Sequence, residues 1–206
     1  SFSSEKSKGI PRRLGRALQF DKKIQELFLT FGSDFKITDK DLLYLTHGLK
    51  SLKSLQRLTL NVEDCSQITD TGLYYLAKGL TRLCSLKSLS LIFFYRSQTD
   101  QFTDTGLDYF SWSLRKMRFL KDTWLELGGD RLDGRLNHLV QLENITWRIP
   151  LSSSLTDLVP SGLEFKKLVS LREVFIELRE CDFLTDKSLD FLTQGLKGLP
   201  NLQKIT

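Results

Sequence analysis

The sequence predicts an α/β repeat fold, a solenoid of about six to seven units in which a strand and a helix alternate. Three observations predict it. One apolar pattern returns at similar spacing along the chain, and its last three apolar positions alternate with other residues, as in a strand. A helical stripe with a marked beginning follows most copies of that pattern.

The repeated pattern reads apolar-x-x-apolar-x-apolar-x-apolar, and its alternating end fits a strand with one buried face. Successive copies are separated by 31, 31, 34, 22, 29 and 31 residues, which is the period of a repeat architecture. The copies begin at Ile24, Leu55, Leu86, Leu120, Leu142 and Leu171, and a seventh begins at Leu202. We expect the last residues to form a seventh strand whose open edge is covered by further protein or by a partner.

The segments after the strands show a helical period. Leu73, Leu76 and Leu80 fall at i, i+3 and i+7, on one stripe of a helix. Thr-Asp pairs precede such stripes, where the Thr oxygen accepts from a free amide and the Asp favours the positive helix end. Late glycines in the helices predict close packing between units. The Thr-Asp pairs begin at Thr38, Thr69, Thr103, Thr156 and Thr185, and the late glycines are Gly48, Gly79 and Gly195.

The stretches LQRLTLNVEDCSQITDTGLYYLAKGL and LREVFIELRECDFLTDKSLDFLTQGL resemble the leucine-rich-repeat family, in its ribonuclease-inhibitor-like and cysteine-containing forms. Cys65 and Cys181 lie ten residues after the first leucine of their copies. The resemblance covers residues 24–206. It implies a curved, right-handed array with parallel strands on the concave side and helices on the convex side.

We expect two parts, a basic N-terminal arm with a capping helix at 1–23 and the leucine-rich-repeat domain at 24–206. The repeat is irregular at 120–162. There Thr123 replaces a core leucine, glycines 128, 129 and 134 replace a helix start, and 150–162 is expected to be a loop with proline breaks.

The net charge of +5 lies entirely in the arm. Residues 1–23 hold seven Lys and Arg against two Asp and Glu, so the remaining residues balance at zero. Because the folded body is neutral, a general nucleic-acid-binding surface on it is not favoured. Within the arm, 11–20 predicts a short amphipathic helix with Arg12, Arg13 and Arg16 outside. This helix either caps the first unit or docks on an acidic or RNA partner.

No pattern in the sequence predicts catalysis, a cofactor or a metal site. His47 and His138 have no second ligand at a useful spacing, and the Gly128-Gly129 turn belongs to no phosphate-binding motif. The odd count of cysteines, Cys65, Cys84 and Cys181, favours reduced, buried thiols. No apolar run is long enough to span a membrane, and we expect no small-molecule substrate.

Strand residues between the buried ones face the concave surface, where a partner would bind. Large aromatics there indicate an interface, unless another part of the chain covers them or the register of the fourth unit slips by one and moves Trp124 into the core. The central column is Phe28, Thr59, Ser90, Trp124, Thr146 and Phe175, and the next is Thr30, Asn61, Ile92, Glu126, Arg148 and Glu177.

These features predict a non-catalytic, protein-binding scaffold that serves as an accessory or structural subunit of a larger complex. The first twenty residues are rich in Ser and Arg, and Phe2-Ser3-Ser4 resembles a processed mitochondrial terminus. The alternative is an ordinary basic terminus of a cytoplasmic protein. In architecture and length the chain is similar to the coupling-factor-B family of ATP synthase. Respiratory, ATP-synthase or mitochondrial ribosome complexes fit, with RNA contacted by the arm. The alternative is a cytosolic substrate-recognition protein of an F-box ubiquitin ligase.

Overall fold

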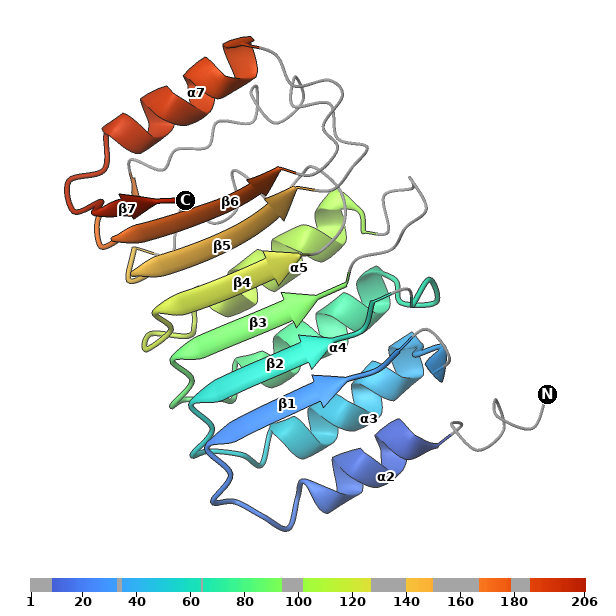
Figure 1. Ribbon diagram of the computed structural model, residues 1–206. Helices are drawn as coiled ribbons and strands as arrows, with labels where there is room; N and C mark the ends of the chain where they lie inside the picture. The colour runs from blue at the N-terminus through green and yellow to red at the C-terminus, as the bar shows by residue number, and fades with distance from the viewer. Residues whose placement is uncertain are drawn as a thin grey trace.

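The computed structural model describes residues 9–32, 35–63, 65–93, 102–126, 140–149, 167–178 and 186–206. Its strands form one sheet of seven parallel strands in the order of the sequence (Figure 1). The strands are β1 (Glu26–Thr30), β2 (Arg57–Asn61), β3 (Ser88–Ile92), β4 (Asp122–Glu126), β5 (Asn144–Ile149), β6 (Glu173–Leu178) and β7 (Lys204–Ile205). The helices are α2 (Ile10–Ala17), α3 (Asp39–Leu49), α4 (Asp70–Leu80), α5 (Asp104–Leu114) and α7 (Asp186–Lys197).

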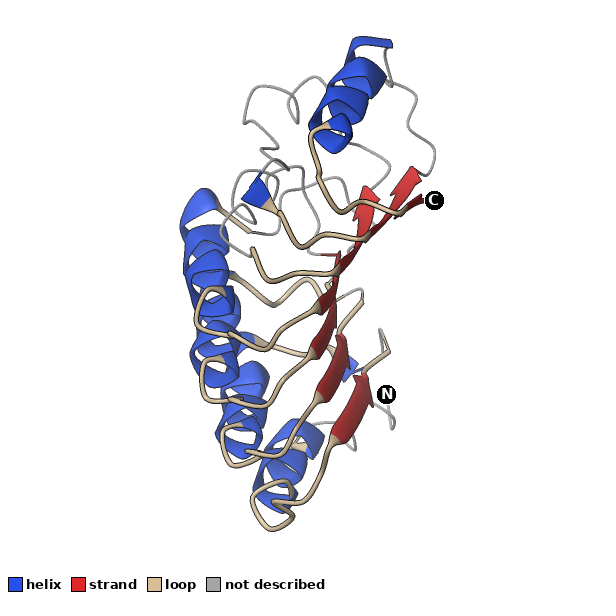
Figure 2. Ribbon diagram, turned by 90° about the vertical axis from the view of Figure 1, so that its left-hand side faces the viewer, coloured by secondary structure: helices blue, strands red, loops and turns tan. Residues whose placement is uncertain are grey.

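Helices α2 to α5 lie side by side on one face of the sheet, each packed on the next. The opposite face, which we call the open face, lies on the inside of the curve of the sheet (Figure 2). Strand and helix therefore alternate from α2 to β4, and each strand of the sheet pairs with the next strand in the sequence. This arrangement confirms the predicted α/β repeat fold at the level of a parallel sheet with a helical layer.

The core lies between the sheet and the helices, and it follows the predicted apolar positions. Neighbouring strands pair in register, so that Leu58 lies beside Leu89 and Leu60 beside Leu91. All four are buried. On the helical side, Leu73, Leu76 and Leu80 of α4 are buried as the stripe predicted. The buried leucines of successive strands thus form rows that run from unit to unit, and these rows make the core continuous.

The Thr-Asp pairs also link successive units. Thr38 and Thr69 cap their own helices as predicted, whereas the side chain of Thr103 accepts no cap hydrogen bond. Thr38 closes a capping box with Asp41 at the start of α3. In the next two units the carboxylate comes from the preceding helix: Asp39 accepts from the amide and hydroxyl of Thr69, at 2.8 Å and 2.7 Å. Asp70 accepts from the same two groups of Thr103, with 2.9 Å to the amide. The pairs therefore form a ladder of charge-assisted hydrogen bonds between units.

Close helix packing confirms the role predicted for the late glycines of α3 and α4. A Cβ on Gly48 would collide with the carbonyl oxygen of Gly15 and lie 2.9 Å from its Cα. A Cβ on Gly79 would press on the methyl group of Thr46. Helix α2, whose Pro11 and Gly15 are buried, therefore lies directly against α3.

Cys65 is buried and free as predicted, but Cys84 is exposed, so its predicted burial is wrong. Cys84 lies in the turn between α4 and β3, where its side chain is not on the apolar stripe. Cys181, the pair at Thr156 and most of the irregular region, including His138, lie outside the described residues. Thr123 is buried in the leucine row, and its hydroxyl has no hydrogen-bond partner there.

Substitution of Gly48 by Ala tests the helix contact. Because the new Cβ meets backbone atoms that cannot rotate away, α2 and α3 must separate, and we expect Gly48→Ala to lower the free energy of unfolding by about 2 kcal/mol. Urea unfolding followed by circular dichroism measures the change. Gly32→Ala is the matched control, since a Cβ at Gly32 meets nothing within 4 Å. Equal stabilities of the two variants would contradict the close contact.

Removal of one rung tests the ladder. Asp70→Ala deletes both acceptors of Thr103 and the negative charge at the start of α4, and we expect it to cost about 1 kcal/mol of unfolding free energy. Thr71→Ala, one residue further along, is the control. Amide hydrogen exchange of Thr103 should also accelerate in Asp70→Ala. Unchanged protection of this amide would show that its hydrogen bond to Asp70 does not stabilise the fold.

Candidate functional site

The parallel register places the predicted central column on the open face. Phe28 pairs with Thr59, Thr59 with Ser90, Ser90 with Trp124, and Trp124 with Thr146, which pairs with Phe175. Phe28 is 64% exposed, Trp124 37% and Phe175 39%. The neighbours of Trp124 in its strand, Thr123 and Leu125, are buried. The register therefore does not slip in the fourth unit, and Trp124 faces outward.

The residues between these aromatics are small. Thr59, Ser90 and Thr146 are half-buried and carry no bulky group. Because adjacent strands lie about 4.8 Å apart, the three strand spacings from Phe28 to Trp124 span about 14 Å. The open face therefore carries a stretch of short side chains between the aromatic side chains of Phe28 and Trp124.

The second predicted column is only partly described. Thr30 is exposed, and Asn61 and Ile92 are half-buried. The Asn61 Oδ1 atom accepts from the amide of Glu63 at 2.9 Å, so this side chain stabilises the turn after β2. Asn61 is therefore less available to a partner than the column alone suggested. Glu126, Arg148 and Glu177 occupy the expected backbone positions in β4, β5 and β6, and their side chains lie outside the description.

The first residues of five strands add charges of both signs to the open face, and these charges offset each other. Arg57 forms an ion pair with Glu26 on the adjacent strand. The amide nitrogen of Asn144 donates to Asp122 at 2.5 Å. Nearby, the ammonium group of Lys121 lies 2.7 Å from Glu143 and lowers the pKa of that carboxyl. The described first residues of the strands include two cations, Arg57 and Lys204, and three anions, Glu26, Asp122 and Glu173. These positions therefore do not make the open face cationic.

The three arginines of the predicted basic arm lie on α2. Arg12, Arg13 and Arg16 are exposed, and the Arg12 guanidinium lies 5.5 Å from the centre of the Tyr44 ring on α3. Such stacking holds the arginine against the next helix. Gly15 of the same helix packs against the backbone of Tyr44, so α2 lies directly on α3.

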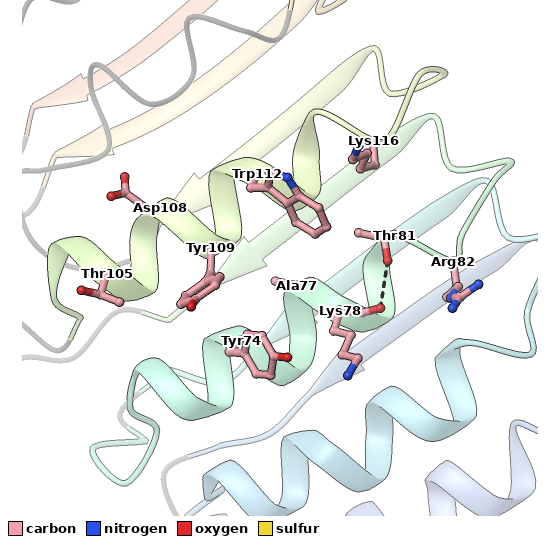
Figure 3. Close-up of a pocket in the computed structure, with 10 residues that line it drawn as sticks. All are labelled: Tyr74, Ala77, Lys78, Thr81, Arg82, Thr105, Asp108, Tyr109, Trp112 and Lys116. Carbon is pink, nitrogen blue, oxygen red and sulfur yellow. Dashed lines mark hydrogen bonds between the residues drawn. The ribbon is translucent and has the colours of Figure 1, made fainter.

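A groove between α4 and α5, on the side away from the sheet, was not predicted. It encloses about 870 Å³, and Ala77 lies among its lining residues (Figure 3). Three aromatics line it while remaining exposed, Tyr74 at 37%, Tyr109 at 49% and Trp112 at 53%. The rings of Tyr74 and Tyr109 meet edge to face across the two helices, with centroids 5.3 Å apart. We call this feature the α4–α5 groove.

Cations gather at the end of the α4–α5 groove formed by the last turns of its helices. Lys78 lies over the Tyr74 ring at 5.8 Å, and Lys116 lies over the Trp112 ring at 5.3 Å. Arg82 lines the same end. Partial burial, followed by repulsion from Lys78 and Arg82, lowers the pKa of Lys50 at the end of α3. The cations of the α3 and α4 units therefore lie close enough to repel each other.

The sequence held a signal for this groove. In α5, Leu107, Phe110 and Leu114 are the buried stripe, so Tyr109 and Trp112 stand off that stripe at i and i+3, on one outward strip of the helix. Aromatics outside the core stripe of an amphipathic helix mark a surface. The sequence did not show that Tyr74 of the preceding helix lies opposite them, because that pairing depends on helix packing.

Within the described residues, no three His, Cys, Asp or Glu side chains gather in a way that would hold a metal ion. None of the described helices is both long and apolar enough to cross a bilayer.

The repulsion around Lys50 gives a prediction. Lys78→Gln removes one neighbouring positive charge, so the charged form of Lys50 becomes more favourable and the pKa of Lys50 rises toward its ordinary value. Burial remains, and the rise is therefore incomplete. A pH titration of the lysine side-chain carbon signals by NMR measures it, with the distant Lys23→Gln as control. A Lys50 pKa that stays unchanged in Lys78→Gln would show that the two cations are not neighbours.

No protein-family model matches the sequence, and no curated protein matches it. Among solved structures, the chain is similar to one titled leiomodin-1 actin-binding site 2, with a TM-score of 0.45 and 13% sequence identity. That likeness covers 91% of this chain and 86% of the other.

Proposed function

We propose that this chain is a non-catalytic, protein-binding scaffold of the leucine-rich-repeat type, an accessory or structural subunit of a larger complex. The observation that carries the proposal is the central column of the open face. Its Phe28, Trp124 and Phe175 are exposed at outward-facing strand positions, where polar side chains would be more usual. Aromatic side chains are favoured in the centres of interfaces, where they bury a large area at a small entropy cost.

The leucine-rich-repeat assignment is supported by the repeat itself. Parallel strands follow each other in sequence order, a leucine row fills the core, and helices α2 to α5 cover one face. In such an array the inner side chains of successive strands form one continuous surface, which suits the binding of a macromolecule.

The charge balance supports a protein partner for the open face. Its described strand starts carry both signs, with Glu26 and Arg57 already paired. Nucleic acid would require a cationic surface that neutralises phosphates. The exposed arginines of α2 are a separate feature, and contact between this arm and RNA is a further part of the proposal.

We place the complex in mitochondria, on the strength of the basic, Ser-rich and acid-poor beginning of the sequence. The proposed complexes are those of the respiratory chain, ATP synthase or the mitochondrial ribosome. The native tagged protein, recovered from fractionated cells, tests this placement. Recovery from cytosol together with ubiquitin-ligase components alone would overturn it, and loss of partners after RNase treatment would assign the complex to the ribosome.

The double variant Trp124→Ala/Phe175→Ala tests the open face. Because the two rings flank Thr146 on adjacent strands, their removal takes away the largest apolar area of that region. We expect recovery of the protein partners to fall at least about tenfold, with the fold intact by circular dichroism. Phe20→Ala/Phe119→Ala removes two exposed aromatics outside the strands and is the matched control. Equal recovery with both double variants would move the interface away from the open face.

A further inference from the structure

We propose that the α4–α5 groove is a second binding site, which takes an acidic peptide segment of a partner protein. Apolar side chains of the segment would cover Tyr109 and Trp112, and its carboxylates would face Lys78, Arg82 and Lys116. This site lies on the helical layer, on the opposite side of the molecule from the open face, so it is independent of the function proposed above.

The aromatic part of the groove is built by two units together. Tyr74 comes from α4 and Tyr109 and Trp112 come from α5, and the edge-to-face contact of Tyr74 with Tyr109 fixes two of the rings (Figure 3). Ala77 lies between them, and its small side chain leaves the groove hollow. Preformed aromatic walls cost a partner little ordering entropy, which favours binding.

The cationic end supplies the charge complementarity. In the described part of the chain, no acidic side chain forms an ion pair with Lys78, Arg82 or Lys116. The ammonium groups of Lys78 and Lys116 lie over the rings of Tyr74 and Trp112. After burial, repulsion from Lys78 and Arg82 lowers the pKa of Lys50. Carboxylates of a bound segment would relieve that repulsion, so an anionic ligand is favoured at this end.

The shape favours a peptide. The lining residues along α5 and the turn after it run from Thr105 to Lys116, which is eleven steps, or about 16 Å at 1.5 Å per step. A segment of two to three helical turns, or about five extended residues, covers that length. Asp108 lines the groove away from the cations, so a nucleic-acid strand running along it would bring phosphates against a carboxylate. A peptide avoids this conflict by carrying acidic residues at one end only.

Selection from a random peptide library of about twelve residues, displayed on phage, tests the proposal with the intact wild-type chain as bait. We expect enriched peptides with two or more Asp or Glu beside aromatic or aliphatic residues. Fluorescence anisotropy of a labelled, enriched peptide then gives its Kd for each variant. Lys78→Glu/Lys116→Glu should weaken binding at least about tenfold, and Tyr109→Ala/Trp112→Ala about fivefold or more.

The control Lys40→Glu/Lys197→Glu changes the net charge of the protein by the same amount at exposed positions outside both the groove and the basic arm, and should alter the Kd less than about twofold. Equal weakening by both charge reversals would overturn the site in favour of unspecific attraction. Enrichment of no acidic peptide would also overturn it, as would displacement of the peptide by oligodeoxythymidine at lower concentration than by the unlabelled peptide. The variant Trp124→Ala/Phe175→Ala should bind the peptide normally, which separates this site from the open face.

Discussion

A mismatch between two packing distances governs this molecule. Hydrogen-bonded strands lie about 4.8 Å apart, whereas packed helices lie about 8 to 10 Å apart. Each of the first units supplies one strand to the sheet and one helix to the same face, so the sheet must bend with the helices outside (Figure 2). The contact of Gly15 with Gly48 brings two helices unusually close, which limits the bend that the mismatch demands.

The same geometry makes the units depend on each other. Thr38 of the first unit is capped locally by Asp41, but Thr69 and Thr103 take their carboxylates from the preceding helix. Each of these two units has a glycine in the first turn of its helix. A Cβ on Gly72 would collide with the carboxylate of Asp39, and a Cβ on Gly106 would collide with that of Asp70. A unit after the first is therefore complete only when its predecessor is folded, which is the cooperativity expected of a stacked repeat.

The bend also gives the two sides of the layer different surfaces. On the open face, in-register pairing places equivalent side chains in columns. Trp124 and Phe175 therefore lie in one column that crosses three strands. On the helical side, the surface between two helices depends on which side chains they turn toward each other. Ala77 is small and the neighbouring aromatics are large, and a groove results between α4 and α5.

The sequence by itself determined the strand positions, the helix starts at Asp39, Asp70, Asp104 and Asp186, and the column containing Phe28, Trp124 and Phe175, because these follow from periods along the chain. Tertiary structure alone decided what lies between units: the exposure of Cys84, the hydrogen bonds of Thr69 and Thr103 to the Asp of the preceding helix, and the pairing of Tyr74 with Tyr109. The physical reason is that a periodic pattern fixes which face of an element is buried, whereas contacts between units depend on how closely neighbouring helices approach.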